Sequence, residues 1–287
     1  MAALDGKICV ITGATSGIGL ATAEQLAAAG ARLVLVGRDR ARSEAAAQRL
    51  QALRPTGEVT LLLADLSHFA GMRRLAADLA ALPRIDVLIN NAGGIFNRRR
   101  VTEDGLELTF ALNHMAYYVL SRLLIGRLAA SAPARVVNVA SRAHVGAQLD
   151  FADLQMERSF AGWRAYGRSK LCNILFTREL ARRLAGTGIT ANCLHPGFVA
   201  SRFGDNNDGV FRAGIGLAKR LFALSAEQGA ETSAYLAASP EVAGTSGRYF
   251  AKCRAVEPSA AARDDDAALR LWNESATLAG LPQGAGA

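Results

Sequence analysis

The chain has 287 residues, of which 51% are hydrophobic and 20% charged, and its formal net charge is +8. This composition is that of a globular protein with a sizeable core, so it excludes a disordered chain, and no run of about 18 apolar residues indicates a membrane-spanning helix. The basic residues are spread along the chain, which predicts a solvated positive surface and no nucleic-acid partner.

The N-terminal sequence MAALDGKICV contains neither a signal peptide nor a membrane anchor. The four cysteines, at positions 9, 172, 193 and 253, form no C-x-x-C pair and have no histidine at metal-ligand spacing. These features predict a soluble, cytoplasmic protein with reduced thiols and no metal site.

Short runs rich in β-branched residues alternate with longer Ala- and Leu-rich helical patterns along the whole chain. This alternation predicts an α/β fold: one doubly wound Rossmann domain over residues 1–287, with a mostly parallel seven-stranded sheet and helices on both faces. Residues 280–287, GLPQGAGA, are predicted to be a flexible tail. The predicted strands are residues 8–12, 32–37, 59–65, 86–92, 135–141, 190–196 and 247–250.

The first strand leads directly into a glycine-rich turn, TGATSGIGL, at residues 12–20. Glycines at such a turn permit a sharp bend, a close approach of the backbone to a pyrophosphate, and close packing of the next helix. The free N–H groups and the dipole of that helix favour an anion at its start. The turn therefore predicts dinucleotide binding, with a plain strand-to-helix turn as the alternative. The residues concerned are Gly13, Thr15, Ser16, Gly17, Ile18 and Gly19.

The end of the second strand distinguishes the two nicotinamide cofactors. An acidic residue there binds the ribose 2′-hydroxyl of NAD, whereas a nearby arginine accommodates the 2′-phosphate of NADP. Gly37 occupies the strand end and Arg38 follows it, while Asp39 is predicted to point elsewhere. Arg38 can make two charge-assisted hydrogen bonds to a phosphate, which predicts NADP(H) as the cofactor. A solvated turn residue is the alternative interpretation.

Tyr166 and Lys170 lie four residues apart in AYGRSKL, so a helix places both on one face. An adjacent ammonium is expected to lower the pKa of the tyrosine, which would make it a general acid or base. The Y-x-x-x-K pattern alone occurs on many helices, but two other polar residues accompany it. Ser141 ends the fifth strand, where its hydroxyl can bind a substrate carbonyl, and Asn113 is an amide in an apolar helix that is predicted to order Lys170 through water.

Several motifs together resemble the short-chain dehydrogenase/reductase family over nearly the whole chain. They are TGATSGIG, Asp65-Leu66, NNAG at residues 90–93, Asn113, Ser141, YGRSK, and HPG at residues 195–197.

The resemblance implies a catalytic tetrad of Asn113, Ser141, Tyr166 and Lys170. In it, Tyr166 is the acid or base, Ser141 holds the carbonyl, and Lys170 binds the nicotinamide ribose and tunes Tyr166. Asn113 completes a proton relay. The cofactor contacts that it implies are Asp65, Leu66, Asn91, Ala92, Gly93, Tyr166, Lys170, Pro196, Gly197 and Val199.

Finer features, such as ALNHMAYYVL, VVNVASRAH and LHPGFV, resemble the retinol-dehydrogenase-like branch. Two departures stand out: no hydrophobic anchor precedes the first strand, and Ala140 stands where many relatives carry a second serine. Residues 201–224 correspond to the family's substrate lid; their glycines indicate mobility, and their apolar residues indicate an apolar substrate.

The sequence therefore predicts an NADP(H)-dependent oxidoreductase that transfers hydride between the nicotinamide and an apolar ketone or aldehyde, or the corresponding alcohol. The alternatives are a non-catalytic NADP-binding regulator and an epimerase or dehydratase of the family's extended branch. The resemblance implies a homodimer, because members of the family often pair through the two helices that correspond to residues 103–130 and 160–185 here; a monomer is the alternative. His144 is predicted to structure the site entrance, with substrate contact as the alternative; His195 is predicted to structure a turn, and His114 to pack in a helix.

Overall fold

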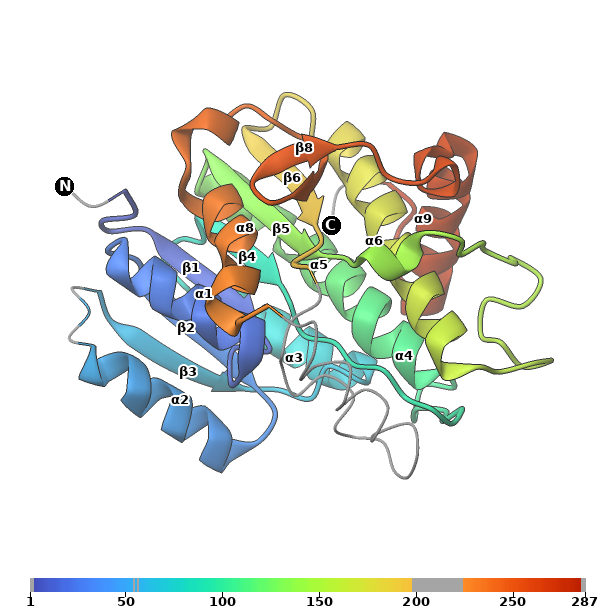
Figure 1. The fold of residues 1–287 in the computed structure, drawn as a ribbon, viewed down its shortest axis with the longest axis horizontal. Helices are drawn as coiled ribbons and strands as arrows, with labels where there is room; N and C mark the ends of the chain where they lie inside the picture. Colours follow the sequence, from blue (N-terminus) through green and yellow to red (C-terminus); the bar gives the residue numbers. More distant parts are fainter. Residues whose placement is uncertain (1–2, 54, 56, 198–223, 285–287) are drawn as a thin grey trace.

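The protein is described here by a computed structural model, which covers residues 3–53, 55, 57–197 and 224–284. In this part of the chain the strands form one eight-stranded sheet in the order β3-β2-β1-β4-β5-β6-β7-β8 (Figure 1). All neighbouring strands are parallel except β7 and β8. The strands are β1 (Ile8–Thr12), β2 (Arg32–Gly37), β3 (Val59–Leu63), β4 (Val87–Asn90), β5 (Ala134–Val139), β6 (Ile189–Leu194), β7 (Tyr249–Ala251) and β8 (Arg254–Val256).

The predicted fold class is confirmed, but the predicted strand count of seven is wrong by one. β8 is a three-residue strand whose residues are all exposed, so it carries no apolar run that marks a strand. It pairs with β7 through a two-residue turn, Lys252 and Cys253, both of which have positive φ angles (48° and 58°). Such turns favour Asn or Gly, and neither residue is present to indicate the hairpin.

Four strands of the sheet end two residues earlier than predicted, at Leu63, Asn90, Val139 and Leu194. The chain leaves the sheet at each of these points. The residues that follow are therefore loop residues at the carboxyl edge of the parallel sheet. Open α/β sheets bind their ligands at this edge.

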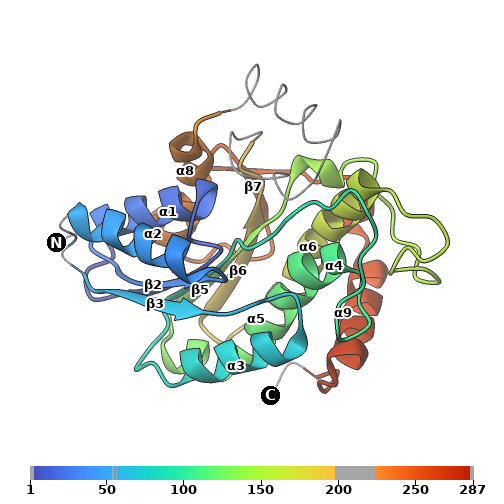
Figure 2. The same ribbon diagram turned by 90° about the horizontal axis from the view of Figure 1, so that it is seen from below.

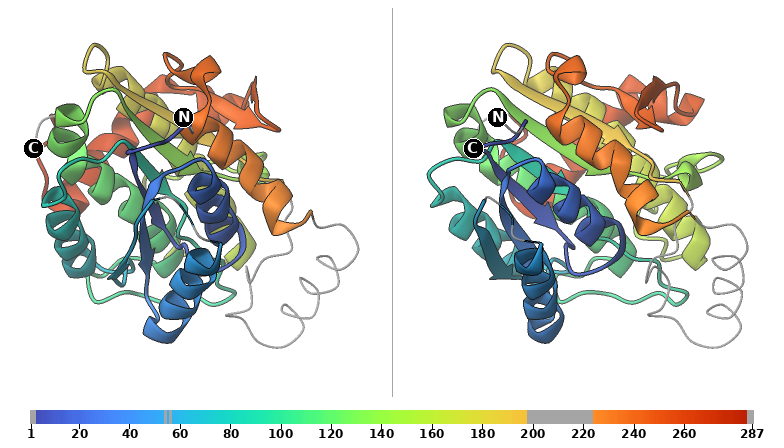
Figure 3. Two further views of the ribbon diagram at one scale, coloured as in Figure 1. Left: turned by 90° about the vertical axis from the view of Figure 1, so that its left-hand side faces the viewer. Right: turned by 60° about the vertical axis from the view of Figure 1, so that its left-hand side comes forward.

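Helices cover both faces of the sheet (Figure 2). One face carries α1 (Gly17–Ala28), α2 (Arg40–Ala52) and α8 (Ala226–Ala238), and Figure 3 shows α1 beside α8. The other carries α3 (Phe69–Ala80), α5 (Ala116–Ala130) and α6 (Gly162–Arg183). Each face has its own cluster of buried aliphatic residues. α5 is preceded by the short helix α4 (Leu108–Phe110) and the π-helical turn Ala111–Met115, so this helical segment begins later than the predicted residue 103.

The C-terminal helix α9 (Asp265–Ala279) packs against α6 and α5, the two helices that the sequence predicts to pair across a dimer. Trp272 of α9 is buried, and the guanidinium groups of Arg122 and Arg183 lie over its ring. The first residues of the predicted flexible tail make specific contacts. Arg122 donates to the carbonyl of Pro282 (2.7 Å), and Trp272 donates to that of Gln283 (2.9 Å).

All four cysteines are free thiols. Cys9, Cys172 and Cys193 are buried, and burial raises the pKa of each to about 12, which keeps them protonated. The cytoplasmic location that their reduced state predicts stays a prediction. In the ranges described, every helix is too short or too polar to cross a bilayer.

Candidate active site

The glycine-rich turn joins β1 to α1 at the carboxyl edge of the sheet. Gly13 has a φ of 68°, and a Cβ atom there would lie 2.8 Å from the Cα of Ala92. A Cβ atom on Gly19 would lie 2.3 Å from the carbonyl oxygen of Gly13. Ser16 is the N-cap of α1, but its side chain makes no capping hydrogen bond. The first N–H groups of α1 are thus left without this cap, which fits the binding of a pyrophosphate.

Asn91, a predicted cofactor contact, holds the glycine-rich turn in place. Its side-chain amide donates to the carbonyls of Thr12 (2.9 Å) and Gly13 (3.2 Å). The backbone N–H groups of Asn91 and Ala92 in turn donate to the hydroxyl of Thr12 (2.9 and 3.0 Å). Thr12 therefore links the ends of β1 and β4. Sequence reasoning missed this role because a threonine within an apolar strand is unremarkable there.

Arg38 and Asp65 meet beyond the ends of β2 and β3. Arg38 Nη1 lies 3.9 Å from Asp65 Oδ2, and the Arg38 side chain is 60% exposed. Burial opposes ionisation of Asp65, but hydrogen bonds from the side chain and backbone of Ser67 outweigh it and lower the pKa of the carboxyl. Leu66, by contrast, is buried in the core. Asp39 points elsewhere, as predicted, because it caps α2 by accepting a hydrogen bond from the backbone of Arg42 (2.9 Å).

Gly37 is enclosed by two short side chains. A Cβ atom there would lie 2.2 Å from Ser43 Oγ and 2.5 Å from Thr15 Cγ2. An acidic residue would need both neighbours to move. The close contact with Thr15 also joins the end of β2 to the glycine-rich turn, so the two parts of the predicted cofactor site are packed together.

The structure brings the four predicted catalytic residues together. Ser141 follows β5, Tyr166 and Lys170 lie on α6, and Asn113 lies in the π-helical turn before α5. The Ser141 hydroxyl accepts a hydrogen bond from the backbone of Ala143 (3.2 Å) and is hydrogen-bonded to the Tyr166 phenol. Lys170 Nζ donates to the carbonyl of Val139 (2.8 Å) and lies 5.7 Å from the centre of the Tyr166 ring.

Burial acts on both members of the Tyr166–Lys170 pair. It raises the pKa of Tyr166 to about 12, against a lowering effect of the Ser141 hydrogen bond. It also lowers the pKa of Lys170 to about 7. The expectation that an adjacent ammonium lowers the pKa of the tyrosine is thus wrong for this state of the protein. The physical reason is that the apolar surroundings disfavour both charged forms. The phenol is therefore protonated at neutral pH.

The side chain of Asn113 makes three hydrogen bonds. Its Oδ1 accepts from the N–H of Gly94 (2.8 Å), and its Nδ2 donates to the carbonyl of Gly94 (2.9 Å) and to Ser169 Oγ (2.9 Å). A Cβ atom on Gly93 would lie 3.0 Å from Asn113 Oδ1 and 3.7 Å from Lys170 Nζ. Gly93, a predicted cofactor contact, therefore lies beside Asn113 and Lys170. Sequence reasoning missed Ser169.

Three histidines have structural contacts. His144 Nδ1 lies 2.7 Å from the carbonyl of Ser141, and its Nε2 accepts from the N–H of Ser259 (3.2 Å), so it braces the loop that carries Ser141. His195 accepts from the N–H of Gly197 within its turn (3.1 Å). His114 is buried, with Nε2 2.9 Å from Ser275 Oγ. These contacts confirm the structural roles predicted for the three.

The same histidines make the protein sensitive to acid. Burial lowers the pKa of all three, that of His114 to about 3, whereas unfolding returns each to about 6.5. The unfolded chain then binds more protons below pH 6.5, so the free energy of unfolding falls as the pH is lowered, by up to about 1.4 kcal/mol per pH unit and histidine. Urea unfolding at several pH values should show this loss. His114→Phe should reduce the slope between pH 5 and 6, and an unchanged slope would contradict the assignment.

Some of the predicted site residues lie outside the part of the chain that the structure describes. Val199 and residues 201–223 of the predicted lid lie outside the described residues. Pro196 and Gly197, also predicted to contact the cofactor, follow β6 at the carboxyl edge of the sheet. Gly197 lies near Leu224, since a Cβ atom there would be 2.7 Å from Leu224 Cδ1.

Comparisons with known proteins agree with this geometry. The family model for short chain dehydrogenases matches residues 7–208. Retinol dehydrogenase 14 from Homo sapiens is 42% identical over 97% of this chain and 88% of its own length. Dehydrogenase/reductase SDR family member 13 from Bos taurus is 44% identical over 99% of this chain and 76% of its own length. An NADP active-site complex of RhlG from Pseudomonas aeruginosa superposes with a TM-score of 0.68 at 30% identity, over 86% of this chain and 94% of that one.

A doubly wound sheet with Ser141, Tyr166 and Lys170 at its carboxyl edge, together with these matches, defines the class: the chain belongs to the short-chain dehydrogenase/reductase family. Within that family it falls in the retinol-dehydrogenase-like branch, because retinol dehydrogenases 11 to 14 are 40–42% identical to it over nearly its whole length.

Proposed function

We propose that the protein is an NADP(H)-dependent oxidoreductase that reduces an apolar aldehyde or ketone, or oxidises the corresponding alcohol, with Tyr166 as the general acid or base. The observation that carries this proposal is the convergence of Ser141, Tyr166 and Lys170 beside Gly93. A binding protein without catalysis would have no use for a reactive phenol hydrogen-bonded to a serine hydroxyl at this edge of the sheet.

The residues present fit a dinucleotide. The start of α1 would hold the pyrophosphate, Arg38 and Asp65 would lie at the adenosine end, and Lys170 would bind the nicotinamide ribose. When bound, the cofactor supplies or accepts the hydride. The protein supplies position and the proton.

The proton chemistry follows from the hydrogen bonds of Ser141 and Tyr166. The N–H of Ala143 binds to the oxygen of the Ser141 hydroxyl, so its hydrogen, which lowers the pKa of Tyr166 through their hydrogen bond, can be donated to a substrate carbonyl instead. Tyr166 is protonated at neutral pH and can give its proton to the oxygen of the reduced carbonyl. In the reverse direction the phenolate would take a proton from the alcohol.

Two exposed apolar side chains, one beside Tyr166 and one in the loop that follows Ser141, support an apolar substrate. Trp163 is 55% exposed, and its ring centre lies 5.8 Å from that of Tyr166. Val145, four residues after Ser141, is 60% exposed. Covering such surface with an apolar molecule is favourable because it removes that surface from water.

The proposal is tested by following NADPH oxidation with a panel of apolar aldehydes and ketones, both aromatic and aliphatic, with a polar sugar aldehyde for comparison. We expect turnover with several apolar carbonyls and little with the sugar. Tight NADPH binding without turnover of any carbonyl would favour a non-catalytic regulator instead.

Arg38→Ala tests the cofactor assignment. Removing one charged hydrogen bond costs about 1.5–3 kcal/mol, so NADPH should bind roughly ten- to a hundred-fold more weakly, while NADH should hardly change. Titration of both cofactors by fluorescence measures this difference. Arg40→Ala is the matched control, because Arg40 is an exposed arginine two residues later, at the start of α2, where it contacts Glu44 (3.6 Å). Equal weakening of NADH and NADPH by Arg38→Ala would remove the main support for NADP. Gly37→Asp is a poorer test, since its Cβ atom would meet Ser43 and Thr15.

A further inference from the structure

Ser169 lies between Tyr166 and Lys170 in the chain, and the chemistry proposed above assigns it no role. Its side chain is buried, with 1% of its surface exposed. The hydroxyl donates to the carbonyl oxygen of Tyr166 (2.7 Å) and accepts a hydrogen bond from Asn113 Nδ2 (2.9 Å). Ser169 therefore joins the helix that carries the reactive tyrosine to the π-helical turn that carries Asn113.

These hydrogen bonds have a fixed direction. A serine hydroxyl has a single hydrogen, and here it is given to the carbonyl of Tyr166, so toward Asn113 the oxygen can only accept. Asn113 must then present its NH₂ group to Ser169. The backbone of Gly94 sets the same orientation, because its N–H donates to Asn113 Oδ1 and its carbonyl accepts from Nδ2.

The orientation matters for the surroundings of Lys170. Asn113 Oδ1 and Lys170 Nζ both approach Gly93, at 3.0 and 3.7 Å from the position of a Cβ atom on that residue. If the Asn113 amide were reversed, its NH₂ group would lie on the side of Gly93 that Lys170 approaches. The NH₂ group would also face the N–H of Gly94, so that two donors would meet without an acceptor. An acceptor on this side suits an ammonium, whereas a donor opposes it.

We propose that Ser169 is a positioning residue, which fixes the Asn113 amide with its oxygen toward Gly93 and Lys170 and so keeps the site in its working geometry. The activity readout of this proposal rests on the proposed reductase function, whereas its structural readout does not.

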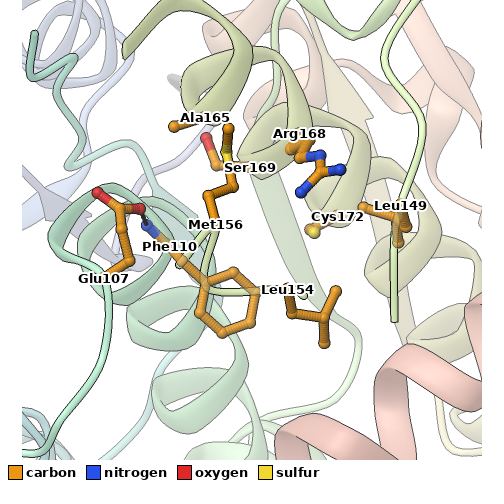
Figure 4. Close-up of a pocket in the computed structure, with 9 residues that line it drawn as sticks. All are labelled: Glu107, Phe110, Leu149, Leu154, Met156, Ala165, Arg168, Ser169 and Cys172. Atoms are coloured by element: carbon orange, nitrogen blue, oxygen red, sulfur yellow. Dashed lines mark hydrogen bonds between the residues drawn. The ribbon is translucent and has the colours of Figure 1, made fainter. Parts of the chain in front are cut away.

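Two substitutions distinguish the effect of the Ser169 hydroxyl from the effect of the rest of its side chain. Ser169→Ala removes the donor and the acceptor, whereas Ser169→Thr keeps both and adds a methyl group. Ser169 lines a small cavity of about 10 Å³ together with Ala165, Cys172 and Glu107 (Figure 4).

Thr177→Val is the matched control. Thr177 is a buried residue on the same helix, and its hydroxyl likewise donates to a backbone carbonyl one turn earlier, that of Asn173 (2.6 Å). It accepts from Asn138 rather than Asn113 (2.9 Å). Its substitution thus removes an equivalent buried hydroxyl without touching the Asn113 amide.

The first experiment is a kinetic cycle. Ser169→Ala should lower kcat roughly tenfold, the usual effect of leaving one buried donor unpaired, with the Kd for NADPH little changed. Ser169→Thr should recover most of kcat, and Thr177→Val should keep it. In an Asn113→Ala background, Ser169→Ala should cause no further loss, because its effect passes through Asn113. Independent losses that multiply, or a loss with Thr177→Val as large as with Ser169→Ala, would overturn the proposal.

The second experiment needs no turnover. With ¹⁵N-labelled asparagine, the side-chain amide signal of Asn113 is identified by its disappearance in Asn113→Ala. Ser169→Ala should shift this signal and speed the exchange of its protons with water, while Thr177→Val should leave it in place. An Asn113 signal unchanged by Ser169→Ala would overturn the positioning role. If the wild type reduces no carbonyl but the signal shifts as expected, the proposed function fails and the positioning role stands.

Discussion

Tyr166→Phe should lower kcat by a factor of about 10² to 10⁴, the usual contribution of a positioned acid or base. The substitution removes the only proton of the ring that can be transferred and keeps the ring itself, which is buried, with 8% of its surface exposed. NADPH should bind nearly as in the wild type. Steady-state NADPH oxidation and a fluorescence titration of NADPH measure the two effects separately.

Tyr117→Phe is the control for this variant. The Tyr117 ring centre lies 5.5 Å from Lys170 Nζ, much as that of Tyr166 does, but its hydroxyl faces the carbonyl of Val139. Loss of this second hydroxyl should leave kcat close to that of the wild type. Near-normal turnover in Tyr166→Phe would refute the acid–base assignment, and equal losses in both variants would point to a general disturbance around Lys170.

Ser141→Ala should lower kcat by a factor of about 10² to 10³, the usual cost of removing one donor to an oxygen that becomes charged in the transition state. The N–H of Ala143 binds to the oxygen of Ser141, so the hydrogen of Ser141 can turn from Tyr166 to the substrate oxygen. The loss should appear in kcat more than in KM, because the interaction strengthens as charge develops. Initial rates over a range of carbonyl concentrations give the two constants.

Ser141 also caps a short 3₁₀ turn, Arg142–His144, so its substitution could act through the loop. Ser239 makes the same contact at another 3₁₀ turn, where its hydroxyl accepts from the N–H of Glu241 at the same 3.2 Å. Ser239→Ala should therefore reproduce the loss of stability that comes from removing such a cap. It should leave kcat unchanged. A Ser141→Ala enzyme with full turnover would remove Ser141 from the mechanism.

The residue pattern alone determined the class of fold and predicted which polar residues meet in the candidate site. Continuous apolar runs between helical repeats suffice for a parallel sheet, since both of its faces must be covered. A strand, three glycines and a helix start suffice to predict an anion site, because the backbone itself is the ligand. The spacing of Tyr166 and Lys170 placed both on one helical face, which the structure confirms.

Only the tertiary structure decided the charge states and the supporting contacts. The pKa values of Tyr166 and Lys170 depend on how deeply packing buries them, and depth of burial is a sum over elements far apart in the chain. The contact of Ser169 with Asn113 likewise joins residues 56 positions apart. Ser43 and Thr15 limit the space beside Gly37. The short strand β8 is defined by its pairing with β7. Local patterns cannot specify such features, because hydrogen bonds and close packing depend on which surfaces meet after the chain has folded.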